Sequence, residues 1–462
     1  MNFSIHSLTF EWRLIARSRL SVVALLLLLV LSTLSVWSGV QEVARQRDTI
    51  AQLAALQAQD AAVATTRNAT GGNAGSAAYY TFHHTWDAPT DAAFLALGLR
   101  DVAPYALRIR ALGLQAQLYE GETFNPEVAL PGRFDFAFVL IYLSPLFVIA
   151  LLHDLVSSER QSGRLRMLAA MPDGGRLWRR RVALRFALLL ACLVLPVLAG
   201  AGWTGLDMGA SVIVLAVAAS YLAFWIGVSL LVGAHGRRSV TNATALMGVW
   251  AVLTLVLPTL ANVALTRAIP VHQGVDLMLA QRQVVHGAWE VPRDETMRKF
   301  YLGHPQWQHS APLPEGFHWK WYFAFHQLGD ESVAGQVQQY RAGLLARQAW
   351  TDRLGWVLPG VGVQAVLHRL AATDLPAQLA YQQRISSFHE ALRNFYYGYL
   401  FTDLPFGPAQ AAHQPVFAPA PGAAPGAAPA PWRTAAAVCL LAWLVFAVGA
   451  WRLVRIKGGG ER

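Results

Sequence analysis

The segment from Ser157 to Pro172 carries the residues best suited to a specific task, and that task is protein contact rather than bond chemistry. It lies between two strongly apolar runs, and its arginines would be costly inside lipid. Leu165, Leu168 and Met171 recur every three residues, which gives a charged helix one narrow apolar stripe. This pattern predicts a helix that docks into a partner protein.

A group of histidines is the main candidate for metal chemistry. It lies in an aromatic-rich stretch and consists of His304, His309, His318 and His326. One interpretation is a metal or ligand site. We favour an aromatic belt resting on the membrane surface, because Trp, Tyr and His are common there and no pair of these histidines has the spacing of helical metal ligands. We therefore expect no metal site, although these four residues remain candidates for one.

Three further motifs point away from catalysis by this chain. His389 and Glu390 begin like a metalloprotease helix, but Arg393 stands where the second histidine is required. No Gly-x-x-x-x-Gly-Lys-Ser/Thr motif occurs, so the chain lacks a phosphate-binding loop of that class. His153 and Asp154, near the end of an apolar run, could relay protons, but a role in positioning the next helix is favoured.

The composition is that of a polytopic membrane protein. Of 462 residues, 55% are hydrophobic and only 14% are charged, and the apolar residues are concentrated in long runs. A net charge of +10 would suggest a nucleic-acid partner in a soluble protein, but here the excess falls in short loops beside the runs. We therefore expect membrane lipids around the chain and no nucleic-acid partner. Both cysteines lie inside apolar runs, which gives no disulfide framework.

Six apolar runs are long enough to cross a bilayer. They cover residues 20–40, 136–155, 182–203, 210–232, 240–265 and 433–455. Arginines gather in residues 1–19, 156–181 and 237–238 and after the last run, so the positive-inside rule places these segments and both termini in the cytoplasm. The first of these segments is an amphipathic helix.

Two long segments then fall outside the membrane, residues 41–135 and 266–432. In the first, a helix continues the first span to about Ala64, and a loop follows over residues 65–78. The second is mostly helical by its apolar period, and residues 418–431 form an Ala/Pro/Gly-rich spacer. Its expected helices cover residues 275–297, 331–356, 363–370 and 378–400. The expected fold is mainly α, with six transmembrane helices and a largely helical extracytoplasmic domain built from two insertions.

The order of these parts resembles the permease subunits of ABC-2 type transporters, also called type V ABC exporters. Residues 10–17 resemble the connecting helix of that family. Residues 158–172 resemble its coupling segment, although Arg164 stands where threonine is common. The large outer segments are similar to a bacterial subgroup whose insertions have no known function. The similar residues are 86–90, 99–105 and 131–136.

The resemblance implies a subunit that couples ATP hydrolysis in a partner chain to movement in the membrane. In the family, the coupling segment contacts a cytoplasmic ATPase subunit, whose dimer binds ATP and Mg, so this chain is expected to hold no cofactor and to be no enzyme. The residues expected to transmit the movement are Glu159, Gly163, Arg164, Leu165, Arg166, Leu168 and Pro172, with Gly163 allowing close backbone approach. The connecting helix contributes Glu11, Arg13 and Arg17.

The expected function is therefore that of the permease subunit of an ABC-2 type transporter in a bacterial inner membrane, moving an unidentified substrate. A translocation path in this family forms between two six-span halves, so a second copy or a sister permease is required, and a periplasmic partner could receive the substrate. Two alternatives remain. One is a scaffold that uses the ATPase for extracytoplasmic assembly without transport. The other is a membrane-bound hydrolase or metal-handling protein that uses His153, Asp154 or the histidine-rich stretch.

Overall fold

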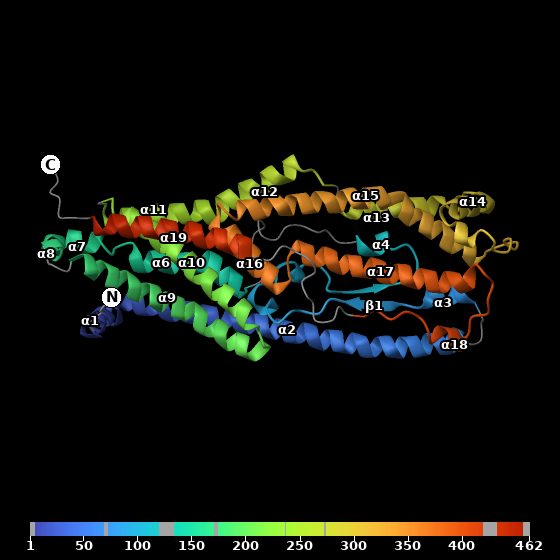
Figure 1. Ribbon diagram of the computed structural model, residues 1–462, viewed down its shortest axis with the longest axis horizontal. Coiled ribbons are helices and arrows are strands. Elements are labelled where there is room, and N and C mark those ends of the chain that lie inside the picture. The colour runs from blue at the N-terminus through green and yellow to red at the C-terminus, as the bar shows by residue number, and fades with distance from the viewer. Residues whose placement is uncertain are drawn as a thin grey trace.

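The computed structural model is a long rod of helices in which two bundles lie end to end (Figure 1). It describes residues 5–68, 73–119, 134–170, 174–235, 237–271, 274–418 and 432–455. The first helix, α1 (Ile5–Arg17), and the end of the last helix, α19 (Trp432–Val454), lie at the same end of the rod. The mainly helical class expected from the sequence is confirmed.

The first bundle, at that end of the rod, contains the helical segments that are long and apolar enough to cross a membrane, and among the residues that the structure describes there are six of them. They are Arg19–Asp60, Phe136–Gln161, Leu177–Thr204, Met208–Gly233, Ser239–Ala268 and Trp432–Val454. Each overlaps one of the six expected runs, so the predicted number and positions of the candidate spans are confirmed.

Several of these segments are built from more than one helical element. Besides α1 and α19, the first bundle contains the start of α2 (Arg19–Asn68), then α5 (Phe136–Phe138), the π-helix η3 (Val139–Leu143), α6 (Ser144–Leu152), α7 (Ser157–Gln161), α8 (Arg164–Ala170), α9 (Gly174–Thr204), α10 (Met208–Gly233), α11 (Ser239–Ala251), the π-helix η4 (Val252–Val256) and α12 (Leu257–Ala268). Helices α7 and α8 lie at the outer end of the rod, beside α1 and the start of α9 (Figure 1).

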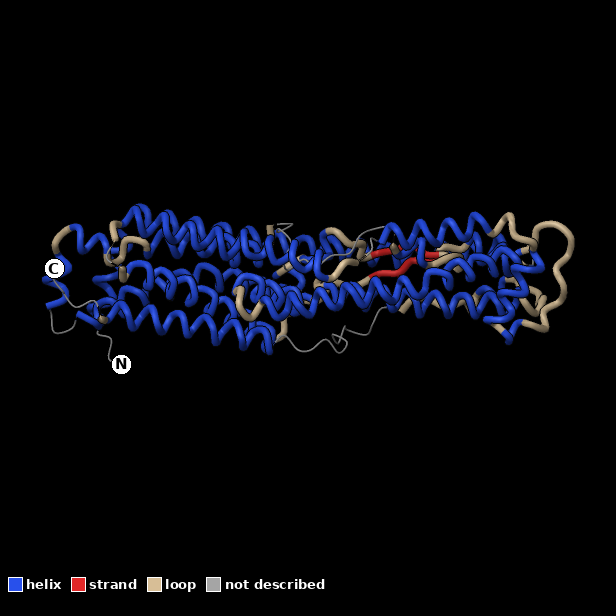
Figure 2. Tube along the Cα trace, turned by 90° about the horizontal axis from the view of Figure 1, so that it is seen from above, coloured by secondary structure: helices blue, strands red, loops and turns tan. Residues whose placement is uncertain are grey.

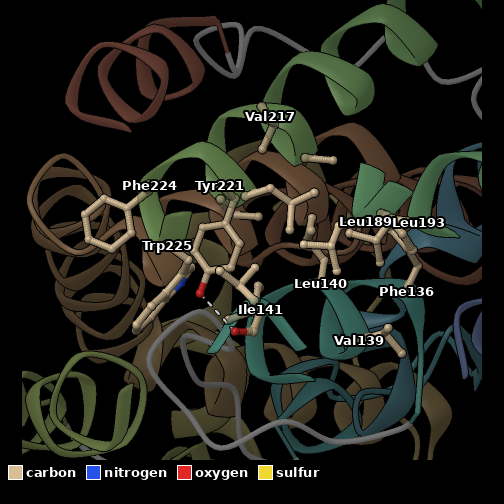
Figure 3. Packing of buried hydrophobic residues seen from close by; sticks show 14 of the residues in the cluster. Phe136, Val139, Leu140, Ile141, Leu189, Leu193, Val217, Tyr221, Phe224 and Trp225 are labelled. Carbon is tan, nitrogen blue, oxygen red and sulfur yellow. Dashed lines mark hydrogen bonds between the residues drawn. The ribbon is translucent and has the colours of Figure 1, made fainter. Parts of the chain in front are cut away.

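A proline in the second candidate span leaves a backbone carbonyl without its helical donor, and side chains of neighbouring helices donate hydrogen bonds there instead. Pro145 has no N–H, so the carbonyl of Ile141, four residues earlier, lacks its usual helical donor. The hydroxyl of Tyr221 from α10 donates to this carbonyl oxygen at 2.9 Å (Figure 3). The indole N–H of Trp250 from α11 donates to the carbonyl of Tyr142 at 3.1 Å. These bonds tie the second span to α10 and α11 around one apolar core.

Helices α10 and α19 approach so closely that glycine is required on both. A Cβ atom placed on Gly449 would lie 2.5 Å from the carbonyl oxygen of Gly227, and one placed on Gly227 would lie 2.7 Å from the Cα of Phe446. We expect Gly449→Ala to destabilise the protein by roughly 1–3 kcal/mol, because the two backbones must separate. Thermal unfolding in detergent measures the effect. Gly202→Ala is the control, because its Cβ would meet nothing within 4 Å of the described chain, and an equal loss in both variants would contradict the prediction.

The second bundle packs around its own apolar core. Its elements are α3 (Ala74–Tyr80), β1 (His83–Trp86), η2 (Gly98–Asp101), β2 (Ala106–Ile109), α4 (Gln115–Leu118), α13 (Gly274–Gly287), α14 (Arg293–Gly303), η5 (Pro305–Trp307), α15 (Trp319–Leu354), α17 (Leu375–Leu400) and α18 (Pro408–Ala411). Two further elements, η1 (Ala93–Leu95) and α16 (Pro359–Ala371), pack instead against the core of the first bundle. Strands β1 and β2 pair antiparallel, with His83 opposite Ile109, and lie among the helices of the second bundle (Figure 2).

Three elements join the two bundles. Helix α2 extends from the first into the second, and its 50 residues span about 75 Å at 1.5 Å per residue. The short helix η1 and helix α16 lie at the junction, where Phe94 and Val363 are fully buried in the core of the first bundle. The rod is therefore continuous in backbone and in packing.

The structure differs from the prediction at two expected elements of the second bundle. Residues 275–297 do not form one helix, because Pro292 cannot donate to a continuing helical ladder, and the segment divides into α13 and α14. Residues 65–78 are not one loop, since α2 continues to its end at Asn68 and α3 begins at Ala74. The side chain of Asn73 caps α3 by accepting the N–H of Gly75 at 2.8 Å.

Helix α15 begins much earlier than the apolar period predicted. The expected helix covered residues 331–356, whereas α15 starts at Trp319. His318 is its N-cap, and its Nδ1 accepts the N–H of Lys320 at 3.2 Å. The dense aromatic residues of this first part hid the helical period. The helices expected over residues 363–370 and 378–400 are confirmed within α16 and α17.

Candidate functional site

Helices α7 and α8 meet in a turn that requires glycine. Gly163 has a φ of +74°, a left-handed conformation that residues with a Cβ rarely adopt. A Cβ placed on it would meet no atom of the described chain within 4 Å. Within the described chain Gly163 therefore serves the turn from α7 into α8, and its expected close approach to a partner stays a prediction.

An arginine whose side chain is only 12% exposed links three elements at this end of the rod. Nη1 of Arg181 on α9 lies 2.8 Å from Oε1 of Glu159 on α7, and its Nε lies 3.3 Å from Oε2 of Glu11 on α1. Glu11 is 3% exposed and Glu159 is 8% exposed. The Nε of Arg164 on α8 adds a further ion pair to Glu159 at 3.0 Å. We call Glu11, Glu159, Arg164 and Arg181 the Arg181 cluster, which joins α1, α7, α8 and α9.

Arg181 is the functional candidate that the sequence reasoning missed. Glu11 and Glu159 were expected to act in separate segments, and the structure brings them to the same guanidinium. The available signal was the arginine run that precedes the third apolar run. Such a run does not show which of its arginines packs inside the bundle and pairs with a carboxylate. Here Arg181 does so, packed over the ring of Trp178 at 5.5 Å from the ring centre.

One residue of the predicted apolar stripe packs against the chain's own core. Leu165 is half-buried and packs against the core of the first bundle. Leu168 is also half-buried, whereas Met167, which lies outside the stripe, is 59% exposed. The side chain of Arg166 and all of Met171 and Pro172 lie outside the described residues. Only part of the stripe is therefore free to contact a partner.

Helix α1 exposes both charge and apolar surface beside the candidate spans. Arg13 and Arg17 are exposed, as expected for the connecting helix, and Ile15 is buried against the bundle. Phe10 is 63% exposed and Trp12 is 50% exposed. An amphipathic helix with exposed aromatic residues suits the surface of a membrane.

His153 and Asp154 lie in the turn between α6 and α7 and make local contacts. Nδ1 of His153 lies 3.0 Å from the carbonyl oxygen of Ile149 in the preceding turn. The carbonyl of His153 accepts a bond from Nδ2 of Asn242 on α11 at 3.4 Å. The carbonyl of Asp154 accepts the N–H of Ser158 at 2.9 Å. These contacts position α7 against α6 and α11, in keeping with the structural role favoured from the sequence.

The second bundle holds a buried ion pair where α4 meets α13, α15 and α17. Nη2 of Arg393 lies 2.7 Å from Oδ2 of Asp330. The same carboxylate accepts the N–H of Leu114 at 2.8 Å and the N–H of Gln115 at 3.1 Å. Nε2 of Gln281 adds a bond at 3.3 Å. The carboxylate is fully satisfied, so it fixes four elements to one another.

His389 is part of the same arrangement, which explains the fragment of a metalloprotease motif. Its Nε2 donates to the carbonyl of Leu112 at 2.6 Å, and Arg393 donates to this carbonyl at 3.1 Å. His389 is 2% exposed and therefore structural. A polar cleft of about 370 Å³ opens beside the ion pair. Its lining includes Gln115, His304, Trp307, Gln327, Glu331 and Glu390, which can hydrogen-bond a polar ligand.

The aromatic stretch forms a core rather than a membrane belt. Trp321 is 5% exposed, Phe323 is fully buried and Phe325 is 1% exposed. They lie in the first turns of α15, at the end of the rod away from the candidate spans (Figure 1). The belt interpretation is therefore wrong, because one face of this helix packs against α13, α14 and α17.

The four histidines of this stretch are separated by the fold. His304 lies 2.7 Å from Glu331, His318 caps α15, and His309 is exposed. His326 is half-buried and stacks on Phe325. In the part of the chain that the structure describes, no group of three or more His, Cys, Asp or Glu side chains could hold a metal ion.

Two histidines with lowered pKa values should make the second bundle less stable in acid. Burial, together with His84, lowers the pKa of His83 to about 4. Burial beside Arg393 and Arg110 lowers the pKa of His326 to about 3. Because both values lie below the ordinary value of about 6.5, the unfolded chain binds these protons first as the pH falls. Stability is unaffected above pH 6.5 and declines from there toward pH 4.

The variant His83→Gln measures this effect. Between pH 7 and pH 4 it should lose about 3 kcal/mol less unfolding free energy than the unmodified protein, as followed by chemical unfolding in detergent. His413→Gln is the matched control, because His413 is exposed. The same pH dependence in all three proteins would contradict the prediction.

Comparison with known proteins gives a family match for one part of the chain. Residues 276–420 match a family model described as a domain of unknown function, DUF3526. The matched region contains α14 to α18 and almost all of α13, so it supplies most of the second bundle. No curated protein matches the chain. No solved structure matches it either.

Proposed function

We propose that this chain is the membrane subunit of an ABC-2 type transporter, driven by a separate ATPase subunit that binds ATP and Mg. The observation that carries the proposal is the Arg181 cluster, which joins α1, α7, α8 and α9 at one end of the candidate spans. Ion pairs of this kind resist separation, since leaving a buried charge without its partner costs several kcal/mol of free energy. A partner that moves α7 and α8 therefore also moves α1 and the third span.

The proposed orientation places the Arg181 cluster in the cytoplasm of a bacterium and the second bundle outside its inner membrane. Exposed arginines at this end of the spans support the orientation under the positive-inside rule. They include Arg13, Arg17, Arg164 and Arg179. The second bundle would then be the extracytoplasmic domain, available to a periplasmic partner.

A second copy or a sister permease would complete a translocation path. The fifth candidate span, Ser239–Ala268, supports this part of the proposal. Only 11% of its most apolar window is buried within the chain. Its apolar surface is therefore left for lipid or for a second subunit.

One observation favours the scaffold alternative, in which the ATPase drives assembly outside the membrane and no substrate crosses. Helix α2 runs unbroken from the first candidate span into the second bundle. There, Nε of Arg100 donates to Gln46 of α2 at 3.0 Å, and its Nη1 pairs with Asp87 at 2.6 Å. A helix fixed in this way can carry movement from the spans to the second bundle. The hydrolase alternative gains no such support, because the His153 side chain lies against the carbonyl of Ile149 in its own helix and its carbonyl is bonded by Asn242, which is a structural role.

The experiment that tests the proposal reverses the charges of α8 in the complex reconstituted with its ATPase. Arg164→Glu combined with Arg166→Glu should abolish the stimulation of ATP hydrolysis without unfolding the protein, since the Arg164 side chain is 61% exposed. Arg237→Glu combined with Arg238→Glu is the matched control, because both side chains are exposed in the loop before α11. Unchanged stimulation in a well-folded Arg164/Arg166 variant would overturn the proposal.

A further inference from the structure

An apolar groove lies between three of the candidate spans, toward the end that carries the Arg181 cluster. Helix α10 supplies its floor through Leu230, which is 3% exposed, and α9 and α19 supply its walls. Its volume is about 310 Å³. The walls include Val182, Phe186, Trp443, Phe446 and Leu453. Every lining residue except one is apolar.

The walls of this groove are fixed by contacts within the chain. The indole N–H of Trp443 donates to the hydroxyl of Ser220 on α10 at 3.1 Å. The ring of Phe446 lies 5.5 Å from that of Trp443, and the ring of Phe186 lies 6.3 Å from it. The close glycine contact between α10 and α19 holds the second wall in place. A ligand would therefore find the groove already formed, which lowers the cost of binding.

The exception in the lining is an arginine. Arg179 of α9 is exposed and makes no ion pair with any residue that the structure describes. Arg452 and Arg455, at the end of α19, add exposed positive charge where the groove ends. An apolar groove with a cation at one end complements a molecule that joins a hydrocarbon chain to an anion. Water is a poor occupant, because apolar cavities do not hold it.

We propose that this groove binds one anionic phospholipid, with an acyl chain between α9 and α19 and its phosphate on Arg179. Basic residues beside grooves between membrane helices select anionic headgroups in this way, and the apolar walls exclude a free inorganic anion. The site does not depend on which ATPase-driven function the chain performs. It would fix the separation of α9 from α19 beside the Arg181 cluster.

Native mass spectrometry of the full chain, ejected from nanodiscs of mixed phosphatidylglycerol and phosphatidylethanolamine, tests the proposal. The unmodified protein should retain one phosphatidylglycerol. Arg179→Glu should lower that retention at least about fivefold, because it removes one basic contact and adds repulsion. Ala450→Phe should do the same without a change in charge, because Ala450 lines the groove and the new ring would fill it.

Arg238→Glu is the matched control, with the same change in charge at an exposed site outside the groove lining. It should retain the lipid. Should either groove variant lose its monodisperse size-exclusion profile, Arg179→Gln and Ala183→Phe would replace it. The proposal is overturned if the unmodified protein retains both lipids equally or none, or if a well-folded groove variant retains phosphatidylglycerol as the control does.

Discussion

Replacing Arg181 by methionine should destabilise the first bundle by about 3–5 kcal/mol, the largest effect expected at this end of the rod. The variant leaves the buried carboxylates of Glu11 and Glu159 without their shared cation. Glu159 keeps its ion pair with Arg164, but Glu11 on α1 loses its ion pair with Arg181 while it stays buried, so α1 should separate from α7 and α9. Thermal unfolding in detergent measures the loss of stability, and proteolysis within α1 reports the separation.

The charge explanation predicts a specific rescue. Glu11→Gln and Glu159→Gln, added to the Arg181 variant, should restore most of the stability, because no uncompensated charge then remains buried. Arg13→Met is the control, since Arg13 is exposed on the same helix α1. A loss in the Arg181 variant no larger than in the Arg13 variant would show that the cluster does not hold these helices together.

Replacing Arg393 by methionine should have an effect of similar size on the second bundle. Asp330 would keep the N–H donors of Leu114 and Gln115 but lose its buried cation, and the carbonyl of Leu112 would lose one of its donors. We expect a loss of about 3–5 kcal/mol. Chemical unfolding in detergent measures it. Limited proteolysis should show new cleavage near α4, because this carboxylate fixes α4 to α15 and α17.

Two variants make this second prediction specific. Asp330→Asn combined with Arg393→Met should recover part of the loss, because the amide is neutral and its oxygen still accepts the two N–H groups. Arg298→Met is the control, since Arg298 is exposed on α14. If the Arg393 variant unfolds like the control and α4 stays protected, the ion pair is not what joins these elements.

The spans could be predicted from the sequence because bilayer thickness imposes a length that apolar runs must match. The helices of the second bundle were predicted where the apolar period was clear, as in α17. The apolar period did not predict the start of α15, because Trp321, Phe323 and Phe325 are interleaved there with further aromatic residues. It also overlooked the break at Pro292, although a proline inside a helical pattern is a visible signal.

The candidate site could be predicted only in part, because its geometry depends on contacts between distant segments. Glu11 and Glu159 were identified from their separate motifs. Their shared partner, Arg181, belongs to a run of arginines that has no distinguishing pattern. The same holds for Asp330 and Arg393, which are 63 residues apart in the sequence. Ion pairs of this kind follow from packing, which local periodicity does not encode.

We propose that this chain works with a separate ATPase bound at α7 and α8. The most direct measurement is to tag the chain, extract it in mild detergent and identify its stoichiometric companions by mass spectrometry. We predict a soluble subunit with a phosphate-binding Gly-x-x-x-x-Gly-Lys-Ser/Thr loop, and its loss when Leu165 and Leu168 are replaced by glutamate in a chain that keeps its size-exclusion profile. A well-folded, monodisperse preparation that brings no ATPase with it would contradict the claim.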